Sequence, residues 1–458
     1  MLNSFLKLEL LNINLSYPFL FLIIIGIVFL LCSAFFKLHK SFYIALTALS
    51  LVLSAFLILS KASNEGLELY AFLDTLTNDI VSFYSSLIIL GFSFLYILMQ
   101  NKESKGEFYA LFLFMVASLL LMVSSSNLVL IFIALEGSSL ALYTLIAMKA
   151  SKNAISSAIK YFSLAIIGSG FFVMAAALIY AKIGTLDLIW NLKDDLKGDF
   201  TFLSACVMIF ILCAIKLSLV PFHFWLKDVY YASNSTLIAF ISVVPKIAIL
   251  AVIIRIFSFL NGSGFEKLII FLAVFSMLSA SLAALSQNNI KKMLAYSSVV
   301  HSSFVLLACV PLIKGENFNL NSIFLYWLLF AFANYGVFMV LNSYKNADFK
   351  DLNSLLYKKP VMAFCLSISV LSLAGIPPFA GFLAKFVILK ELVVNDYWYL
   401  ALFIAFASMI MLYAYLKILI NALFIKAKIT HIFELNFTQK LILTLCIFVS
   451  IFAILLML

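Results

Sequence analysis

The hydrophobic positions of this chain come in runs of about 20 residues, and short polar connections separate the runs. A helix of that length crosses the hydrocarbon core of a bilayer, which is about 30 Å thick. The runs are apolar on all sides, as is typical of helices that face lipid or other membrane helices. The pattern predicts an all-α polytopic membrane protein with about fourteen transmembrane helices, whose approximate limits are 17–36, 42–60, 80–99, 108–124, 127–148, 155–181, 201–226, 236–258, 267–286, 294–313, 321–343, 361–390, 397–424 and 438–458.

Prolines in two of these runs begin similar motifs. Pro221 begins PFHFWL in the seventh span, and Pro378 begins PFAGFL in the twelfth. Proline removes a backbone donor and clashes with the preceding turn, so we expect a broken helix at each position. The two spans lie five apart and cross the membrane in opposite directions, which predicts two inverted five-helix repeats, spans 4–8 and 9–13. Broken helices at matching positions of inverted repeats indicate a transport path.

The repeats predict four segments along the chain. Residues 1–104 hold the first three spans, 105–260 the first repeat, 261–425 the second repeat and 426–458 the last span. Composition agrees with this organisation, because 65% of the residues are hydrophobic and 11% are charged. A soluble domain is closer to half apolar and a quarter charged. No polar stretch is long enough for a separate soluble domain.

The net charge and the cysteines narrow the function further. The net charge of +10 is spread among loops and forms no basic tract, which indicates a membrane surface and no nucleic acid. The six cysteines are scattered through apolar spans, without a CxxC motif or a Cys/His group. They are typical of small buried hydrophobic residues. We therefore expect no metal, iron–sulfur or haem site in this chain.

The lysines of the connecting loops predict the orientation. About sixteen lie in one alternate set of loops, Lys149 and Lys291 among them, against about nine cationic residues in the other set. The second set also carries most of the acidic residues, such as Asp79 and Asp187. The positive-inside rule places the lysine-rich set in the cytoplasm. Both termini are then predicted on the periplasmic side.

Ionisable residues inside the apolar runs are the main candidates for chemistry. Glu136, Lys216, Lys246 and Lys385 lie well within predicted spans, and Lys160 lies about six residues into its span. An ionised side chain at membrane depth costs at least about 2.5–3.5 kcal/mol. A lysine taken out of water can exchange a proton near neutral pH, and a nearby carboxylate opposes that loss. Charges of both signs at this depth predict a proton relay.

Most of these residues also have a simpler explanation. Glu136 could form a structural ion pair, although the small residues beside it favour close helix packing and a functional role. Lys216 and Lys385, near the two prolines, could be fixed charges that satisfy the carbonyls of broken helices. Lys160 could extend to the cytoplasmic surface, and so could Lys417.

Two histidines are further candidates for the relay. His223 follows Pro221, and His301 lies in AYSSVVHSSF. A histidine among serines can pass protons at neutral pH, or it can be a satisfied polar group of a helix bundle. Tyr296 and Asn334 could supply hydrogen bonds to the same path.

Six segments, in this order, carry a resemblance to a known family. The chain resembles the antiporter-like membrane subunits of respiratory complex I and of related multisubunit cation/proton antiporters over roughly residues 105–425. The segments are ALEGSSLALYTLIA, SAIKYFSLAIIGSG, AIKLSLVPFHFWLKDVY, FISVVPKIA, NNIKKMLAYSSVVHSSF and LSLAGIPPFAGFLAKFVILKEL. Within the family, the chain is most similar to a branch that ends after the fourteenth span and carries lysine at position 385. It departs from that branch at ALEGSSLALY and YYASNST, which affects packing and loop shape but no ionisable position.

The resemblance implies a function and a set of partners. It implies one proton path, in which Glu136 and Lys216 form a coupled pair, Lys246 is the central relay and Lys385 lies on the exit side. It implies no redox cofactor in this chain, with flavin, iron–sulfur clusters and quinone in partner subunits. The partners would be other membrane subunits of a bacterial inner-membrane complex, including other antiporter-like subunits. The alternatives are a stand-alone cation/proton antiporter, a membrane-bound hydrogenase, or a scaffold whose charges only hold helices together.

Overall fold

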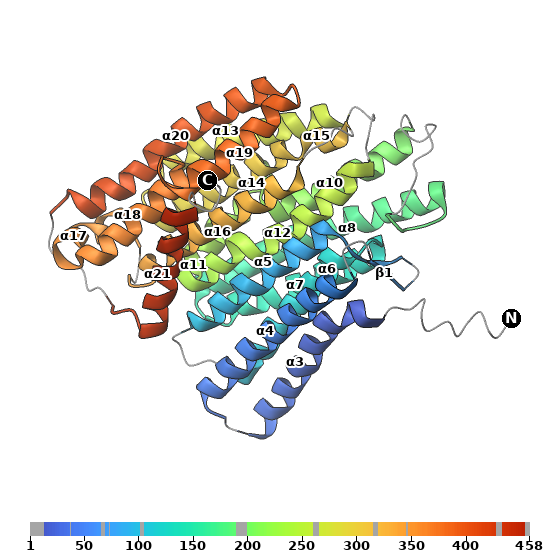
Figure 1. The fold of residues 1–458 in the computed structure, drawn as a ribbon, viewed down its shortest axis with the longest axis horizontal. Helices are drawn as coiled ribbons and strands as arrows, with labels where there is room; N and C mark the ends of the chain where they lie inside the picture. Colours follow the sequence, from blue (N-terminus) through green and yellow to red (C-terminus); the bar gives the residue numbers. More distant parts are fainter. Residues whose placement is uncertain are drawn as a thin grey trace. The chain divides into compact units, whose positions relative to one another are not determined.

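The computed structural model describes residues 13–36, 38–65, 69–72, 74–100, 105–188, 199–259, 265–314, 319–344, 347–426 and 433–453. These residues are almost entirely helical (Figure 1). In chain order the elements are η1 Ile13–Ser16, α3 Tyr17–Phe35, α4 Lys40–Glu65, β1 Leu69–Ala71, β2 Leu76–Asn78, α5 Ile80–Leu98, α6 Gly106–Ser124, α7 Leu128–Ala147, α8 Lys152–Ile183, α10 Phe200–Leu217, α11 Phe224–Ala232, α12 Ser235–Phe259, α13 Glu266–Leu285, α14 Ile290–Ala308, α15 Val310–Ile313, α16 Leu320–Leu341, η2 Phe349–Leu352, α17 Leu355–Lys358, α18 Pro360–Ala374, α19 Ala380–Val394, α20 Trp398–Leu423 and α21 Phe437–Phe452.

The prediction of an all-α polytopic membrane protein is confirmed. Within the described ranges, twelve helices are long and apolar enough to cross a membrane, and Pro360–Ala374 and Phe437–Phe452 are shorter apolar helices. The total of fourteen spans and the inverted repeats stay predictions. The end of the last predicted span, 454–458, lies outside the described residues.

The two predicted helix breaks are present. The run 201–226 ends its first helix at Leu217 and resumes at Phe224. The run 361–390 ends its first helix at Ala374 and resumes at Ala380. Each break contains the proline that predicted it. Backbone polar groups left without helical partners in such breaks need other partners at membrane depth.

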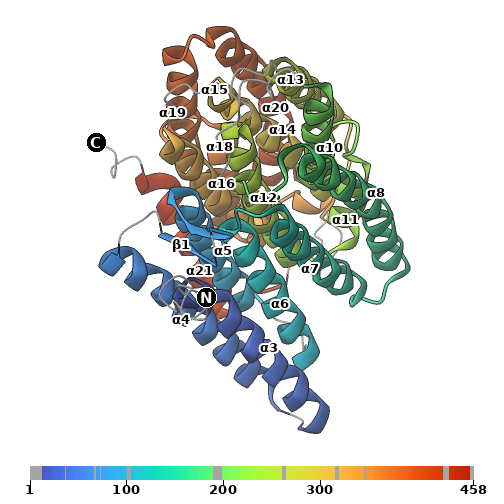
Figure 2. The ribbon, with the colours of Figure 1, turned by 90° about the vertical axis from the view of Figure 1, so that its right-hand side faces the viewer.

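The helices form two compact units. The first comprises Met1–Lys216 and Val244–Ser263. In it, α3 packs along α4 and α6 (Figure 1), and α7 packs between α6 and α8 (Figure 2). The short antiparallel hairpin of β1 and β2 pairs Leu69 with Asn78 and leads into α5.

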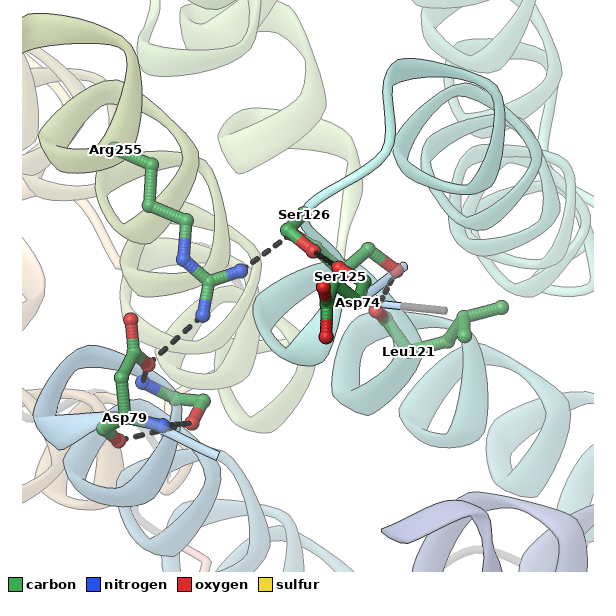
Figure 3. Close-up of polar contacts among 7 residues, drawn as sticks. Asp74, Asp79, Leu121, Ser125, Ser126 and Arg255 are labelled. Atoms are coloured by element: carbon green, nitrogen blue, oxygen red, sulfur yellow. Dashed lines mark hydrogen bonds and ion pairs between the residues drawn. The ribbon is translucent and has the colours of Figure 1, made fainter. Parts of the chain in front are cut away.

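A buried arginine joins the end of α12 to other elements of the first unit. Arg255 is 8% exposed. Its guanidinium donates to Asp79 Oδ1 at 2.9 Å and to the Ser125 carbonyl (Figure 3). Asp79 also caps α5, because its Oδ1 accepts from Ser82 N at 2.7 Å. Burial acts to raise the pKa of Asp79, but Arg255 and the Ser82 hydrogen bonds outweigh it and hold the pKa below its usual range.

The second unit comprises Leu217–Val243 and Gly264–Leu458. In it, α16 contacts α18, α19 and α21, and α14 packs on α11, α13 and α20. Every residue of α14 except the half-buried Lys292 is buried inside the protein. Asn289 caps α14 by accepting from Lys292 N at 3.3 Å, and its amide donates to Asp348 at 2.7 Å. The polar segment AYSSVVHSSF of α14 is therefore enclosed by other helices of the second unit.

Candidate proton path

Lys216 lies in a polar cluster between α7, α8 and α10. Its ammonium donates to Ser139 Oγ at 2.6 Å and to Tyr143 OH at 3.4 Å. The same nitrogen lies 5.8 Å from the ring centroid of Tyr143 and 5.2 Å from that of Tyr161. Lys216 is only 7% exposed. A buried ammonium needs acceptors, and this cluster supplies oxygens and aromatic faces in place of water.

Glu136 belongs to the same cluster. It lies on α7, one turn before Ser139, and its carboxylate accepts a hydrogen bond from Ser169 Oγ of α8. Lys216 contacts two further residues of the same helix, Ser139 and Tyr143. Ser139 and Tyr143 follow Glu136 by three and seven residues, so all three side chains share one face of α7. The two predicted members of the coupled pair are therefore brought together, with hydroxyl groups beside both.

A small cavity adjoins the Lys216 ammonium. Ser138, Ser139, Tyr161 and Lys216 line its polar side, and Pro245 of α12 lines it too; the remaining wall is formed by Met115, Leu119, Met122, Leu135, Leu142 and Ile249. A buried water needs two to four polar partners, and the polar side of this cavity supplies them. The cavity extends from Lys216 to the residue that precedes Lys246.

Lys246 lies in the middle of α12 and is 1% exposed. Pro245 lies inside the same helix, so one backbone donor is missing directly before the lysine. The role of Lys246 as the central relay stays a prediction.

Lys385 lies at the second helix break. Its ammonium donates to the Ala374 carbonyl at 2.8 Å, which is the last residue of α18. Gly375 follows with φ +80°, a left-handed conformation that favours glycine, and a Cβ there would lie 2.8 Å from Lys385 Cδ. The contact is the one expected of a charge that satisfies a broken-helix carbonyl, and it also fixes the position of an exchangeable proton donor.

His301 lies in a hydrogen-bonded network of the second unit. Its Nδ1 is bonded to Tyr326 OH of α16 at 2.6 Å, and its Nε2 to Tyr415 OH of α20 at 3.0 Å. Tyr415 OH is bonded in turn to Ser297 Oγ. The sequence indicated the histidine but neither tyrosine. A tyrosine in an apolar helix is typical of packing, and no local spacing connects residues that lie 25 and 114 positions away.

The remaining candidates lie outside these networks. Lys160 is on an exposed face of α8, next to Ile159, whereas the adjacent Tyr161 faces Lys216. His223 lies at the first break and is partly exposed; its ring centroid is 6.0 Å from that of Tyr296. Asn334 and Lys417 make separate contacts. Asn334 Nδ2 donates to Ser242 Oγ, and Lys417 Nζ donates to the Gln287 carbonyl at 2.9 Å.

The side chains of the two clusters determine which chemistry they can perform. Over the described part of the chain, no group of three or more His, Cys, Asp or Glu side chains is placed to hold a metal ion. The clusters at Lys216 and His301 instead consist of ammonium, carboxylate, imidazole and hydroxyl groups. These are proton donors and acceptors, so the chemistry they can perform is proton transfer.

Comparison with known proteins identifies the family. The family model described as NADH:quinone oxidoreductase/Mrp antiporter, TM, matches residues 125–411. The chain belongs to this NADH:quinone oxidoreductase/Mrp antiporter family. The matched range contains both helix breaks, the polar cluster at Lys216, and His301 with its partner Tyr326, whereas Tyr415 lies just beyond it. The resemblance inferred from the six motifs is confirmed.

Two relatives in this family match over nearly their whole length. NADH-quinone oxidoreductase subunit N of Campylobacter jejuni (strain RM1221) is 68% identical, with 100% of both chains covered. NADH-quinone oxidoreductase subunit N of Campylobacter lari (strain RM2100) is 46% identical, with 99% of both chains covered. Their names agree with the branch of the family that the sequence favoured.

Solved structures give the same fold. A chain of respiratory complex I from Thermus thermophilus with bound aureothin has a TM-score of 0.85 at 24% identity, with 96% of this chain and 98% of that chain covered. A chain of the Mrp complex from Dietzia sp. DQ12-45-1b has a TM-score of 0.83 at 17% identity, with 97% and 95% covered. At these identities the likeness concerns the fold alone.

Proposed function

We propose that the chain is the proton-translocating subunit N of a bacterial NADH–quinone oxidoreductase. The observation that carries the proposal is the 68% identity, over the full length of both chains, to a protein named NADH-quinone oxidoreductase subunit N. The cluster around Lys216 supports it, because a carboxylate, an ammonium and hydroxyl groups meet there at membrane depth. As a subunit of that complex the chain takes part in an enzyme reaction without a redox centre of its own.

The proton path we propose starts at the coupled pair. Loss of the proton from Lys216 leaves a neutral amine that still accepts from Ser139 or Tyr143, and a charge on Glu136 opposes that loss. We propose that the two groups act as a coupled pair, in which a change of charge at one partner biases proton transfer at the other. The cavity beside Lys216 provides a place for water toward the Pro245–Lys246 segment of α12.

Lys246 would be the central member and Lys385 the member on the exit side. Support for Lys246 is its nearly complete burial beside a proline. Support for Lys385 is its hydrogen bond to the Ala374 carbonyl at the broken end of α18. Movement of the break would expose or remove this acceptor. Support for His301 is its pair of hydrogen bonds to the buried hydroxyls of Tyr326 and Tyr415. Lys160 and His223 stay predictions for groups at the edges of the path.

The chain would work with other subunits in the bacterial inner membrane. We propose that flavin, iron–sulfur clusters and quinone are held by those partners, which include other antiporter-like subunits. Both termini would lie on the periplasmic side, as the lysine distribution predicts. The two inverted repeats, 105–260 and 261–425, would each supply one helix break to the path.

The main alternative is a stand-alone cation/proton antiporter. The two functions differ in the energy source, so an affinity-tagged copy of the chain in its own membranes separates them. We expect the tag to recover a multisubunit complex that reduces quinone, and vesicles containing it to take up protons only while the electron donor is oxidised. Sodium-driven proton exchange by the recovered complex without a donor would contradict the proposal.

A further inference from the structure

His301 is held on both sides by tyrosine hydroxyls. Tyr326, His301, Tyr415 and Ser297 form one continuous line of hydrogen bonds that joins α16, α14 and α20. All four side chains are at most 4% exposed. Ser297 lies one turn before His301 on α14, so the line leaves that helix at the imidazole and returns to it at the serine.

A neutral imidazole has one donor nitrogen and one acceptor nitrogen. If Nδ1 accepts from Tyr326, then Nε2 carries the proton and donates to Tyr415 oxygen, whose own proton points to Ser297. The direction of every bond in the line is therefore set by the tautomer of His301. Reversing that tautomer reverses all of them together.

This arrangement can transfer a proton with complete balance of atoms and charge. A proton that binds the Tyr326 oxygen releases the hydroxyl proton to Nδ1. The Nε2 proton then moves to the Tyr415 oxygen, and the Tyr415 hydroxyl proton moves to Ser297, whose own proton leaves. Each of the four groups gains one proton and loses one, no bond between heavy atoms breaks, and no redox partner is needed.

We propose that Tyr326 and Tyr415 are relay residues that deliver a proton to His301 and remove it. This inference rests on the proposed proton-translocating function and names two tyrosines that no sequence pattern indicated. A histidine held only for packing needs one partner for each nitrogen. Here Tyr415 has a second partner in Ser297, so the line continues beyond the imidazole.

The test replaces each tyrosine by phenylalanine in the assembled complex. Tyr326→Phe and Tyr415→Phe keep the rings, including the contact of Tyr326 with Phe304 at 4.6 Å between centroids, and remove only the hydroxyl groups. Tyr344→Phe is the matched control, because Tyr344 has a buried hydroxyl without a hydrogen-bond partner among the described residues. The readouts are subunit level by blotting and donor-driven proton uptake into inverted vesicles per quinone reduced.

We expect each single variant to lower coupled proton uptake at least about tenfold, because general acid–base groups contribute about 10²–10⁴-fold to proton transfer. The double variant should be no worse than the poorer single variant, because one missing link already interrupts a line in series. Wild-type uptake in either single variant would overturn the proposal. Independent losses that multiply in the double variant would also overturn it, since they would indicate two separate packing roles.

A parallel Lys246→Ala variant keeps the inference distinct from the function on which it rests. If Lys246→Ala loses proton uptake while both tyrosine variants retain it, the relay at Tyr326 and Tyr415 is wrong and the proposed function stands. If the unaltered complex shows no donor-driven proton uptake, the proposed function is wrong and the inference fails with it.

Discussion

Removing the Ser139 hydroxyl should slow proton transfer at Lys216 without disturbing the fold. Ser139 Oγ accepts from the buried Lys216 ammonium at 2.6 Å. A hydrogen bond with one charged partner contributes about 1.5–3 kcal/mol. At about 1.4 kcal/mol for each factor of ten, a step that needs the charged form of Lys216 should slow by about ten- to a hundredfold in Ser139→Ala.

Ser138→Ala is a close control for this change. Ser138 and Ser139 are adjacent, both are buried, and both hydroxyls donate to the Leu135 carbonyl, at 2.9 and 2.6 Å. Of the two, the Lys216 ammonium is bonded to Ser139. Because Ser138 also lines the cavity beside Lys216, the control should lose some activity but clearly less than Ser139→Ala.

The assay is donor-driven proton uptake into inverted vesicles, with quinone reduction measured in parallel and complex assembly checked by native gel. Unaltered proton uptake in the Ser139→Ala complex would contradict this prediction, because it would show that the hydrogen bond from Lys216 to Ser139 does not affect proton transfer. An equal loss in both would refute it as well, since the loss would then follow the shared packing of α7.

Three further changes test other parts of the account. Lys246→Arg should leave proton uptake near background at normal subunit level, because arginine keeps its proton at any accessible pH; near-normal uptake would mean that position 246 supplies only charge. Asp79→Asn should lower the melting temperature of the purified complex at neutral pH. The lowered pKa of Asp79 stabilises the fold above the ordinary carboxyl value of about 4, and this contribution is lost as the pH falls through the lowered value. The difference from the unaltered complex should therefore narrow on acidification, and a constant difference would argue against the pairing with Arg255. Gly381→Ala should reduce the assembled subunit on blots, because its Cβ would lie 1.7 Å from a backbone oxygen of α18 and overpacking costs about 1–3 kcal/mol or more. Gly170→Ala, with no atom within 4 Å of its Cβ, should assemble normally.

The apolar runs of the sequence were enough to predict the membrane helices and the two breaks. The hydrocarbon core demands helices of a fixed length, so each run has few alternatives. The similar motifs at Pro221 and Pro378 were equally informative, because proline breaks or kinks a helix. Pro245, in contrast, lies within the continuous helix α12. Long-range polar contacts had no such local signal, and Tyr326 and Tyr415 were therefore missed.

The buried face of each helix was harder to predict than the residues at which the helix begins and ends. Lipid is as apolar as the protein interior, so an exposed position such as Ile159 looks like a buried one in the sequence. Lys160 lies on such an exposed face, and its role in the path stays a prediction. A usable signal did exist on α7, where Glu136, Ser139 and Tyr143 follow the spacing of one helix face.

Proton translocation is proposed to depend most on the coupled pair Glu136 and Lys216, and Glu136→Gln tests this role most directly. Glutamine keeps the size of the side chain and an acceptor for Ser169 but removes the charge that Lys216 senses. The measurement is proton uptake and quinone reduction in inverted vesicles that contain the assembled variant. The account predicts that both fall together to a small fraction of the unaltered rates, because the remaining partner can no longer alternate between its two protonation states. Unaltered proton uptake in the assembled Glu136→Gln complex would contradict it.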